Sequence, residues 1–148
     1  MIFDRTISDV RNAQEIRQSK LQKGVPLNVS DIEILEKGTV TVNTINRIES
    51  KQTELADVLK GMGYYAEIIT KTWDKGDVFY ESDFQRICDN NTAIRQAFFV
   101  YADSPEDAVP AFEYEELNAL ERILHDLERM IEFAKTAYRF CGTVECGG

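Results

Sequence analysis

Apolar residues recur three and four positions apart along most of the chain, the spacing that places side chains on one face of an α-helix. Glycine or proline follows each of the first three repeats, as at helix ends. The pattern therefore predicts an all-α fold, a helical bundle. The expected helices span about 8–23, 30–38, 43–60, 82–101 and 112–138.

Two of these helices begin with a sequence typical of a capping box, in which Ser and a later Glu or Gln satisfy free amide groups. Ser30 with Glu33 predicts the start of the second helix, and Ser82 with Gln85 predicts the start of the fourth. The adjacent asparagines at 90–91 are a candidate interruption of the fourth helix.

Residues 62–80 differ from the rest of the chain, because aromatic and β-branched residues alternate there with glycines. This composition predicts one extended, aromatic-rich segment with turns and a short strand around 65–70. Trp73 is the only tryptophan of the chain, and we expect it to anchor this segment to the helices.

Two prolines stand among the acidic and small residues of 103–111, which predicts a linker. The linker would divide a helical N-terminal region, 1–102, from a C-terminal region, 112–148. The latter combines the long helix with a tail that contains two cysteines.

The last helix carries apolar residues at alternating spacings of three and four, a 3.5-residue repeat typical of a coiled-coil-like seam. Two arrangements fit this seam: an antiparallel bundle within one chain, or an interface between identical chains. The residues of the candidate interface are Leu117, Leu120, Leu124, Leu127, Ile131, Ala134 and Tyr138.

Three helix openings look alike: they begin at Ile45, Phe84 and Leu117, and each has a further apolar residue three and ten positions later. Each opening also places Asn or Gln directly after its first apolar residue, where the amide could cap a helix or bridge to a neighbour. Any amphipathic helix gives such a stripe, and the openings are 39 and 33 residues apart. The sequence alone therefore leaves a true repeat undecided.

The charge of the chain excludes some partners. With 17 basic and 26 acidic residues the net charge is −9, so the surface repels phosphate, and we expect neither nucleic acid nor an anionic membrane as a partner. The chain contains no apolar run near the ~20 residues that a membrane helix needs, and no signal peptide is evident. We expect a soluble protein made in the cytoplasm.

The sequence contains no signature of a nucleotide-binding, metalloprotease or hydrolase site. His125, the only histidine, falls beside the apolar seam, where a structural role is expected. Cys141 and Cys146 could form a disulfide or remain free thiols, and Cys88 fits a buried thiol. We therefore expect no enzyme activity, no cofactor and no metal.

The segments 41–49 (TVNTINRIE), 71–77 (KTWDKGD) and 82–87 (SDFQRI) resemble tail-associated structural proteins of phages and prophages of Gram-positive bacteria. Such proteins often carry W-x-x-G-D followed by a helix opening similar to D-[FL]-N-R-I-E. Position 85 is Gln rather than Asn and position 88 is Cys rather than Glu, so the second opening departs from that pattern.

This resemblance implies a virion building block, an adaptor in the tail, fibre or baseplate region that assembles with copies of itself and with other tail proteins. It implies location in the tail of the virion. The alternative is an acidic binding or regulatory module that acts on a host protein.

Overall fold

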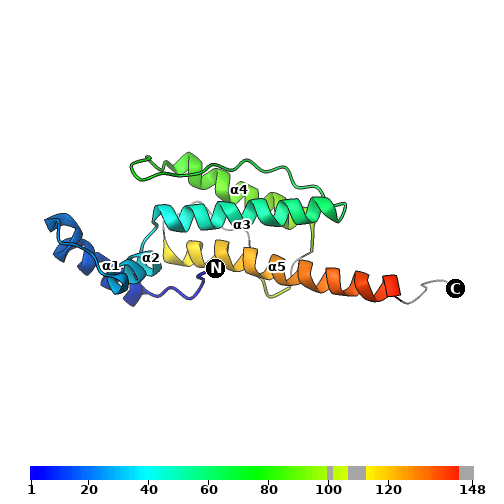
Figure 1. Ribbon diagram of the computed structural model, residues 1–148, viewed down its shortest axis with the longest axis horizontal. Coiled ribbons are helices and arrows are strands. Elements are labelled where there is room, and N and C mark those ends of the chain that lie inside the picture. The colour runs from blue at the N-terminus through cyan, green and yellow to red at the C-terminus, as the bar shows by residue number, and fades with distance from the viewer. Residues whose placement is uncertain (100–101, 107–112, 144–148) are drawn as a thin grey trace.

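The computed structural model describes residues 1–99, 102–106 and 113–143, with side chains up to residue 137. The described part of the chain is helical throughout its regular secondary structure and contains no strand (Figure 1). The predicted all-α fold is confirmed, and the strand expected around 65–70 is not present. The elements are α1 (Ile7–Ser19), a 3-10 turn (Leu21–Lys23), α2 (Val29–Gly38), α3 (Val42–Gly61), α4 (Glu81–Ala97) and α5 (Tyr114–Thr143).

The two predicted capping boxes are wrong in position. At α2, Asn28 is the capping residue: its side chain accepts from the Asp31 amide at 2.8 Å, and the Asp31 carboxylate accepts from the Asn28 amide at 2.9 Å. At α4, the Asp83 carboxylate accepts from the Tyr80 amide at 3.1 Å. Aspartate fills the role expected of Glu or Gln, so each helix begins before the serine.

Helix α4 runs without interruption through its two adjacent asparagines, contrary to expectation. Both are buried, and both have hydrogen-bond partners on neighbouring elements. Asn91 donates to the carbonyl of Leu120 at 3.0 Å and accepts from the Gln52 side chain at 2.7 Å. Asn90 donates to the Gln52 side chain at 3.1 Å. Because the amides are satisfied across helices, they do not compete with the backbone of their own helix.

Helices α1 and α2 form a hairpin that packs closely. A side chain at Gly38 would collide with the Asp9 carbonyl oxygen and with Ala13, so glycine lets the two backbones approach. Lys20 and Asp31 add an ion pair at 2.6 Å. The hairpin lies at one end of the molecule, near the first turns of α3 and α5 (Figure 1).

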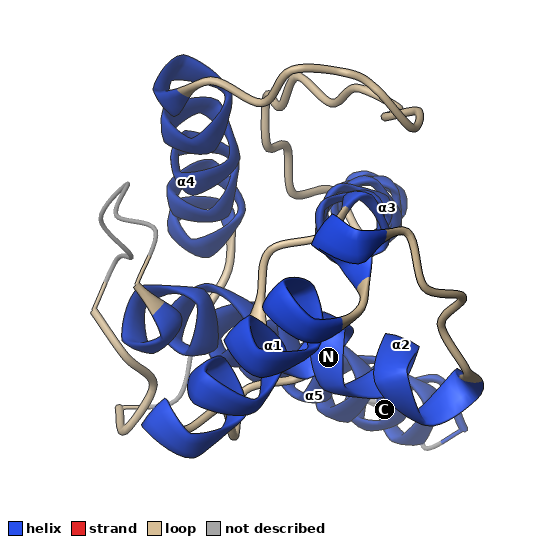
Figure 2. Cartoon of the chain, turned by 90° about the vertical axis from the view of Figure 1, so that its left-hand side faces the viewer, coloured by secondary structure: helices blue, strands red, loops and turns tan. Residues whose placement is uncertain are grey.

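Helices α3, α4 and α5 all begin at the same end of the molecule and run in the same general direction (Figure 1). Figure 2, a view from that end, shows α3 and α4 above α5. The bundle is therefore parallel, and the antiparallel arrangement is wrong. Residues 62–80 can span up to ~60 Å when extended, about twice the length of a 20-residue helix. The chain can thus return to the starting end before the next helix.

The three similar helix openings lie at the starting ends of these three helices. All nine apolar positions that define them are buried, each at most 5% exposed, and belong to one hydrophobic cluster. These positions are Ile45, Ile48, Leu55, Phe84, Ile87, Ile94, Leu117, Leu120 and Leu127. The shared stripe predicted from the sequence is confirmed.

The amide that follows the first apolar residue of α3 holds an extended stretch of backbone. Asn46 accepts from the Trp73 backbone amide at 2.9 Å and donates to the Trp73 carbonyl at 2.8 Å. Three residues further on, buried Glu49 accepts from the Lys71 amide at 2.9 Å, from the Trp73 indole and from Arg86 of α4. We call Asn46, Glu49 and Arg86 the first clamp.

Helix α5 repeats this arrangement with the N-terminal segment of the chain. Asn118 accepts from the Arg5 backbone amide at 3.1 Å and donates to the Arg5 carbonyl at 2.9 Å. Buried Glu121 accepts from the Ile2 amide at 2.6 Å and pairs with Arg5 at 2.6 Å and with Arg47 of α3 at 2.9 Å. We call Asn118, Glu121 and Arg47 the second clamp.

Helix α4 has no such clamp at its equivalent position. Gln85 is exposed and donates to Asp89 of its own helix at 2.8 Å. Buried Cys88 of α4 stands where α3 and α5 have glutamate. Half-buried Ala119 of α5 stands where α3 and α4 have arginine. A third ion pair, between position 88 of α4 and position 119 of α5, is therefore missing because both of its charged residues are replaced.

Candidate docking surface

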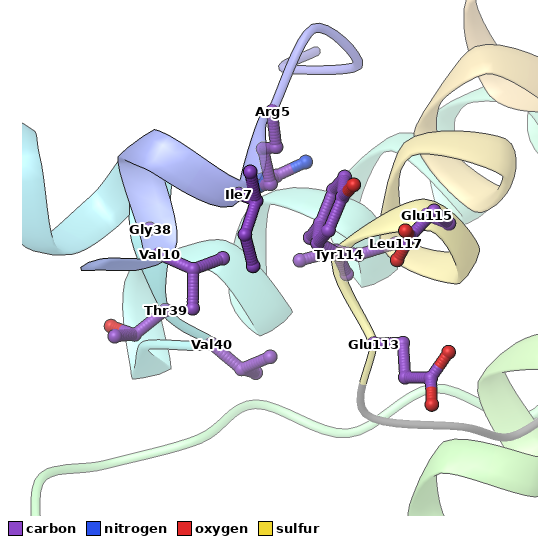
Figure 3. Close-up of a pocket in the computed structure, with 10 residues that line it drawn as sticks. All are labelled: Arg5, Ile7, Val10, Gly38, Thr39, Val40, Glu113, Tyr114, Glu115 and Leu117. Atoms are coloured by element: carbon purple, nitrogen blue, oxygen red, sulfur yellow. The ribbon is translucent and has the colours of Figure 1, made fainter. Parts of the chain in front are cut away.

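A cavity of about 370 Å³ lies between the N-terminal segment, the end of α2 and the start of α5. The side chains of Ile7, Val10, Val40 and Tyr114 face one another across it, and Glu113 lies at its edge (Figure 3). Arg5, its buried cation, is paired with Glu121 of the second clamp. This charge therefore serves the fold, and the cavity offers mainly apolar contacts.

A second cavity, of about 400 Å³, runs beside α4 and is lined by six residues of polar type and by Ile69. Its cation is Arg86, which binds Glu49 and the Ile69 carbonyl. Of its two side-chain amides, Asn90 accepts from the Ile69 amide at 3.0 Å and donates to the Ile69 carbonyl at 2.8 Å, and Gln85 donates to Asp89. Arg86 and Asn90 hold residues 62–80, which we call the returning segment, against the bundle.

The residues with the chemistry for catalysis or metal binding are spread over the fold. The ring of His125 packs against Phe3 with centroids 5.0 Å apart, which fits the structural role expected of it. The side chains of Cys141 and Cys146 lie outside the described residues. Over 1–99, 102–106 and 113–137, no three His, Cys, Asp or Glu side chains are grouped so as to hold a metal ion.

Within the described ranges, no helix is both long and apolar enough to cross a bilayer.

Five of the seven residues predicted to form an interface lie inside the chain's own core. Leu117, Leu120, Leu124, Leu127 and Ile131 are at most 4% exposed and belong to the cluster shared by α3, α4 and α5. Up to Ile131, the heptad stripe of α5 therefore packs against helices of its own chain. Beyond it, Ala134 is half-buried, and the Tyr138 side chain lies outside the described residues.

An apolar surface lies where α3 and α4 end and α5 continues (Figure 1). It surrounds a cavity of about 310 Å³. Every residue that lines it is aliphatic, aromatic or methionine. We call this set the distal α5 surface: Tyr64, Phe98, Phe99, Met130, Phe133, Ala134 and Ala137.

The ends of two helices bring aromatic rings to this surface. After α3, Gly63 adopts φ +90°, a conformation that favours glycine, and the Tyr64 amide then donates to the Leu59 carbonyl at 2.9 Å. After α4, the chain becomes extended at Phe98. The Tyr64 and Phe98 rings meet edge to face, 5.0 Å apart, and Phe99 lies 5.7 Å from Phe98.

Much of this surface is open to solvent. Phe99 and Phe133 are each 69% exposed, unusual for the largest apolar side chains. Clustered exposed apolar residues mark sites of interaction with protein or ligand, whereas single ones are common. The distal α5 surface is therefore the strongest candidate for a functional site on the described part of the chain.

Of the residues that line this surface, only Ala134 belongs to the interface predicted from the sequence. A signal for part of it was present: Met130, Phe133 and Ala137 follow spacings of three and four, a second apolar stripe beside the heptad seam. Which stripe is covered depends on the side of α5 against which α3 and α4 pack, and spacing within α5 does not report that.

Comparison of the chain with protein-family models, with curated proteins and with solved structures finds no match.

Proposed function

We propose that this protein is a structural assembly protein of a phage or prophage virion, an adaptor in the tail, fibre or baseplate region that docks through helical surfaces. The observation that carries the proposal is the distal α5 surface, where Phe99 and Phe133 are largely exposed. In this role the coiled-coil-like α5 extends from a folded bundle to bind other tail proteins, and no catalysis is required.

The residues that carry the resemblance to tail-associated proteins support this proposal. Asn46 and Glu49 belong to the first clamp, and Trp73 is held by it. Together they fix the returning segment to α3. Arg47 belongs to the second clamp. Residues that organise a scaffold are those expected to be shared among structural proteins.

The alternative, an acidic module that acts on a host protein, needs its negative charge on the outside. Four acidic side chains are buried: Asp31, Glu49, Glu121 and Asp126. Three of them have Lys or Arg partners within 3 Å, and the fourth lies 3.4 Å from Arg122. Each pair removes a cation along with a carboxylate, so the net charge of −9 stays with the rest of the chain and does not decide between the two roles. The uncharged lining of the distal α5 surface is what favours the assembly role.

The proposal is tested on particles from the strain that encodes the chain. Density-gradient-purified particles are analysed by quantitative mass spectrometry, and the protein is expected at a constant ratio to the tail proteins. Recovery only in the supernatant that contains host proteins would overturn the proposal.

A substitution tests the surface itself. Phe133→Asp places a charge on the distal α5 surface and is expected to remove the protein from particles without unfolding it, since Phe133 is 69% exposed. Val29→Asp on α2 is the matched control, because Val29 is also exposed, at 73%, and is remote from that surface. Equal incorporation of both variants would show that docking uses another surface.

A further inference from the structure

We infer that the returning segment pairs edge to edge with the same segment of a second copy, as two antiparallel strands about a two-fold axis at Ile69. This surface is separate from the distal α5 surface, so the inference does not rest on the proposed function. Three features support it: the segment has one unpaired edge, its residue types favour a strand, and its charges match in the pair.

One edge of the returning segment is bound to the bundle through alternate residues. The amides of Ile69, Lys71 and Trp73 each donate to a side chain of α3 or α4 at 2.9–3.0 Å. The carbonyls of Ile69 and Trp73 accept from side-chain amides of the same two helices at 2.8 Å. This period of two is that of an extended strand, in which successive residues direct their backbone groups to opposite edges. The bound edge therefore belongs to the odd positions.

The opposite edge belongs to the even positions and is unpaired. Over the described ranges, neither the amides nor the carbonyls of Ile68, Thr70 and Thr72 have a hydrogen-bond partner. Thr70 and Thr72 are exposed, and the segment runs along the outside of the bundle (Figures 1 and 2). A row of unpaired amides and carbonyls is a template for a further strand. An extended chain can therefore bind here and leave the bound edge intact.

The residue types of this stretch also favour a strand. Positions 64–73 are rich in tyrosine, isoleucine and threonine, types that are enriched in strands. Tyr64, Ala66 and Ile68 pack against the core, whereas Ile69 is 69% exposed. A strand is nevertheless absent from the described chain, because the free edge has no partner there. A second copy supplies that partner and covers Ile69 with its own equivalent.

The charges select the register of the pair. With the axis at Ile69, the free groups of Ile68 meet those of Thr70, and Glu67 of each copy faces Lys71 of the other. Both charged side chains are exposed, and neither has an ion-pair partner in the described part of the chain. They occupy non-hydrogen-bonded positions, where side chains approach most closely, and opposite charges that face each other across strands are favourable. A shift of two residues in either direction separates them.

The contact is small, because a stable interface usually involves ~20–30 residues on each side. We therefore expect weak dimerisation. Analytical ultracentrifugation of the full chain from roughly 10 μM to 1 mM, a range suited to weak binding, is expected to show a monomer–dimer equilibrium. A monomer throughout this range would overturn the inference.

Hydrogen exchange identifies the edge that pairs. The amides of Ile68 and Thr70 are expected to exchange several-fold more slowly at the high end of this concentration range than at the low end. The Ile69 amide is bound in both states, so its exchange is expected to stay unchanged. A dimer in which Ile68 and Thr70 gain no protection would use another surface and would overturn the inference.

Thr70→Pro removes one free amide and leaves the bound edge in place. The variant is expected to remain folded, and its dimer dissociation constant is expected to rise at least several-fold, because proline cannot donate to a strand partner. Thr70→Ala is the matched control: it removes the 3.3 Å contact between the Thr70 and Thr53 hydroxyls but keeps the amide. Circular dichroism melts check folding. Equal dimerisation of the two variants would contradict edge pairing.

Charge reversal tests the register without changing the backbone. Glu67→Lys and Lys71→Glu each create two like-charge contacts in the pair, so each is expected to raise the dissociation constant several-fold. The double variant and an equimolar mixture of the two single variants are both expected to restore association; failure of either to do so would overturn the register. Phe133→Asp, on the distal α5 surface, is expected to leave the dimer unchanged, and loss of the dimer in that variant would assign it to the other surface.

Discussion

The first and second clamps take Asn and Glu from equivalent positions of α3 and α5 and an arginine from a neighbouring helix, yet they hold different segments. The first holds an internal segment through Trp73 and Lys71, and the second holds the N-terminal segment through Arg5 and Ile2. Their carboxylates also differ in partners. Glu49 binds one arginine and an indole, whereas Glu121 binds two arginines.

The difference between the clamps and α4 shows what a buried carboxylate requires. Arg86 of α4 reaches Glu49 of α3, and Arg47 of α3 reaches Glu121 of α5. If each helix contacted the next one in the same way, position 119 of α5 would reach position 88 of α4, but these residues are Ala119 and Cys88. A buried charge is tolerated only with a partner, so the loss of both members leaves an apolar contact rather than an unpaired ion.

These relations indicate that α3, α4 and α5 are three versions of one helical unit. The unequal spacing of the openings no longer argues against a repeat, because α4 ends three residues sooner after its opening than α3 does, and the connection after it is three residues shorter. The α1–α2 hairpin then stands as an insertion between the N-terminal segment and α3.

The largest effect is expected from breaking the second clamp. Glu121→Ala leaves Arg5 and Arg47 without their buried carboxylate, and the side chains of Arg5 and Glu121 are at most 1% exposed. Removing one partner of a buried ion pair costs about 3–5 kcal/mol. Urea denaturation is expected to show a loss of this size in the free energy of unfolding.

Glu128 is the matched control, on the same helix. It pairs with Lys51 at 2.8 Å but is 38% exposed, and an exposed pair contributes about 0–1 kcal/mol. If Glu128→Ala and Glu121→Ala lowered stability equally, the second clamp would not differ from a surface ion pair.

The next largest loss of stability is expected at the side-chain amides that follow the first apolar residue of each helix opening. Asn46→Ala and Asn118→Ala each leave a backbone amide and carbonyl without their partners, at a cost of about 1–3 kcal/mol for a buried group. Hydrogen exchange is expected to accelerate at the Trp73 amide in the first variant and at the Arg5 amide in the second. Gln85→Ala is the control, because this amide binds only an exposed side chain of its own helix.

Each acceleration is expected at its own segment. Loss of protection at both segments in either single variant would mean that the clamps act as one cooperative unit rather than as two repeats of a local device. An effect of Gln85→Ala as large as that of the asparagines would contradict the distinction between α4 and the other helices.

The helices themselves were predictable because their period and their stops are local. The nine apolar positions of the three openings share one spacing, and all are buried. The direction of the helices was not predictable, since it depends on a returning segment held by side-chain amides rather than by a strand. Asn46 and Asn118 were noted only as amides able to cap or bridge.

The candidate site was harder to predict for a related reason. Leu124 and Phe133 are both large apolar residues of α5, but the first is 0% exposed and the second 69%. What separates them is the side of α5 on which they lie: nine residues at about 100° each place them on opposite faces, and α3 and α4 cover only one of these faces. Periodicity identifies a face of a helix, whereas exposure depends on what other elements leave uncovered.

A third test rebuilds the ion pair that α4 lacks. Cys88→Glu alone places a charge in an apolar cluster, and Ala119→Arg alone adds a cation without a carboxylate. If the three helices are equivalent, the double variant recovers part of the loss. The coupling free energy in a double-mutant cycle is expected to favour the pair, within the range of about 0.5–3 kcal/mol seen for residues in contact. Additive effects would show that positions 88 and 119 do not meet as the other two pairs do.

The smallest effect concerns the thiol at the position without a clamp. Burial, with smaller contributions from Asp89 and Glu116, raises the pKa of Cys88 to about 12, against about 8.5 in an unfolded chain. The folded state therefore retains the proton, so this contribution to stability is present below about pH 8.5 and is lost as the pH rises toward 12. In a Cys141→Ser, Cys146→Ser background, the free energy of unfolding should fall more steeply between about pH 8 and 10 with Cys88 than with Cys88→Ala. Equal slopes would mean that the thiol is no more buried than in the unfolded chain, and position 88 would then not be part of the apolar contact that replaces the third clamp.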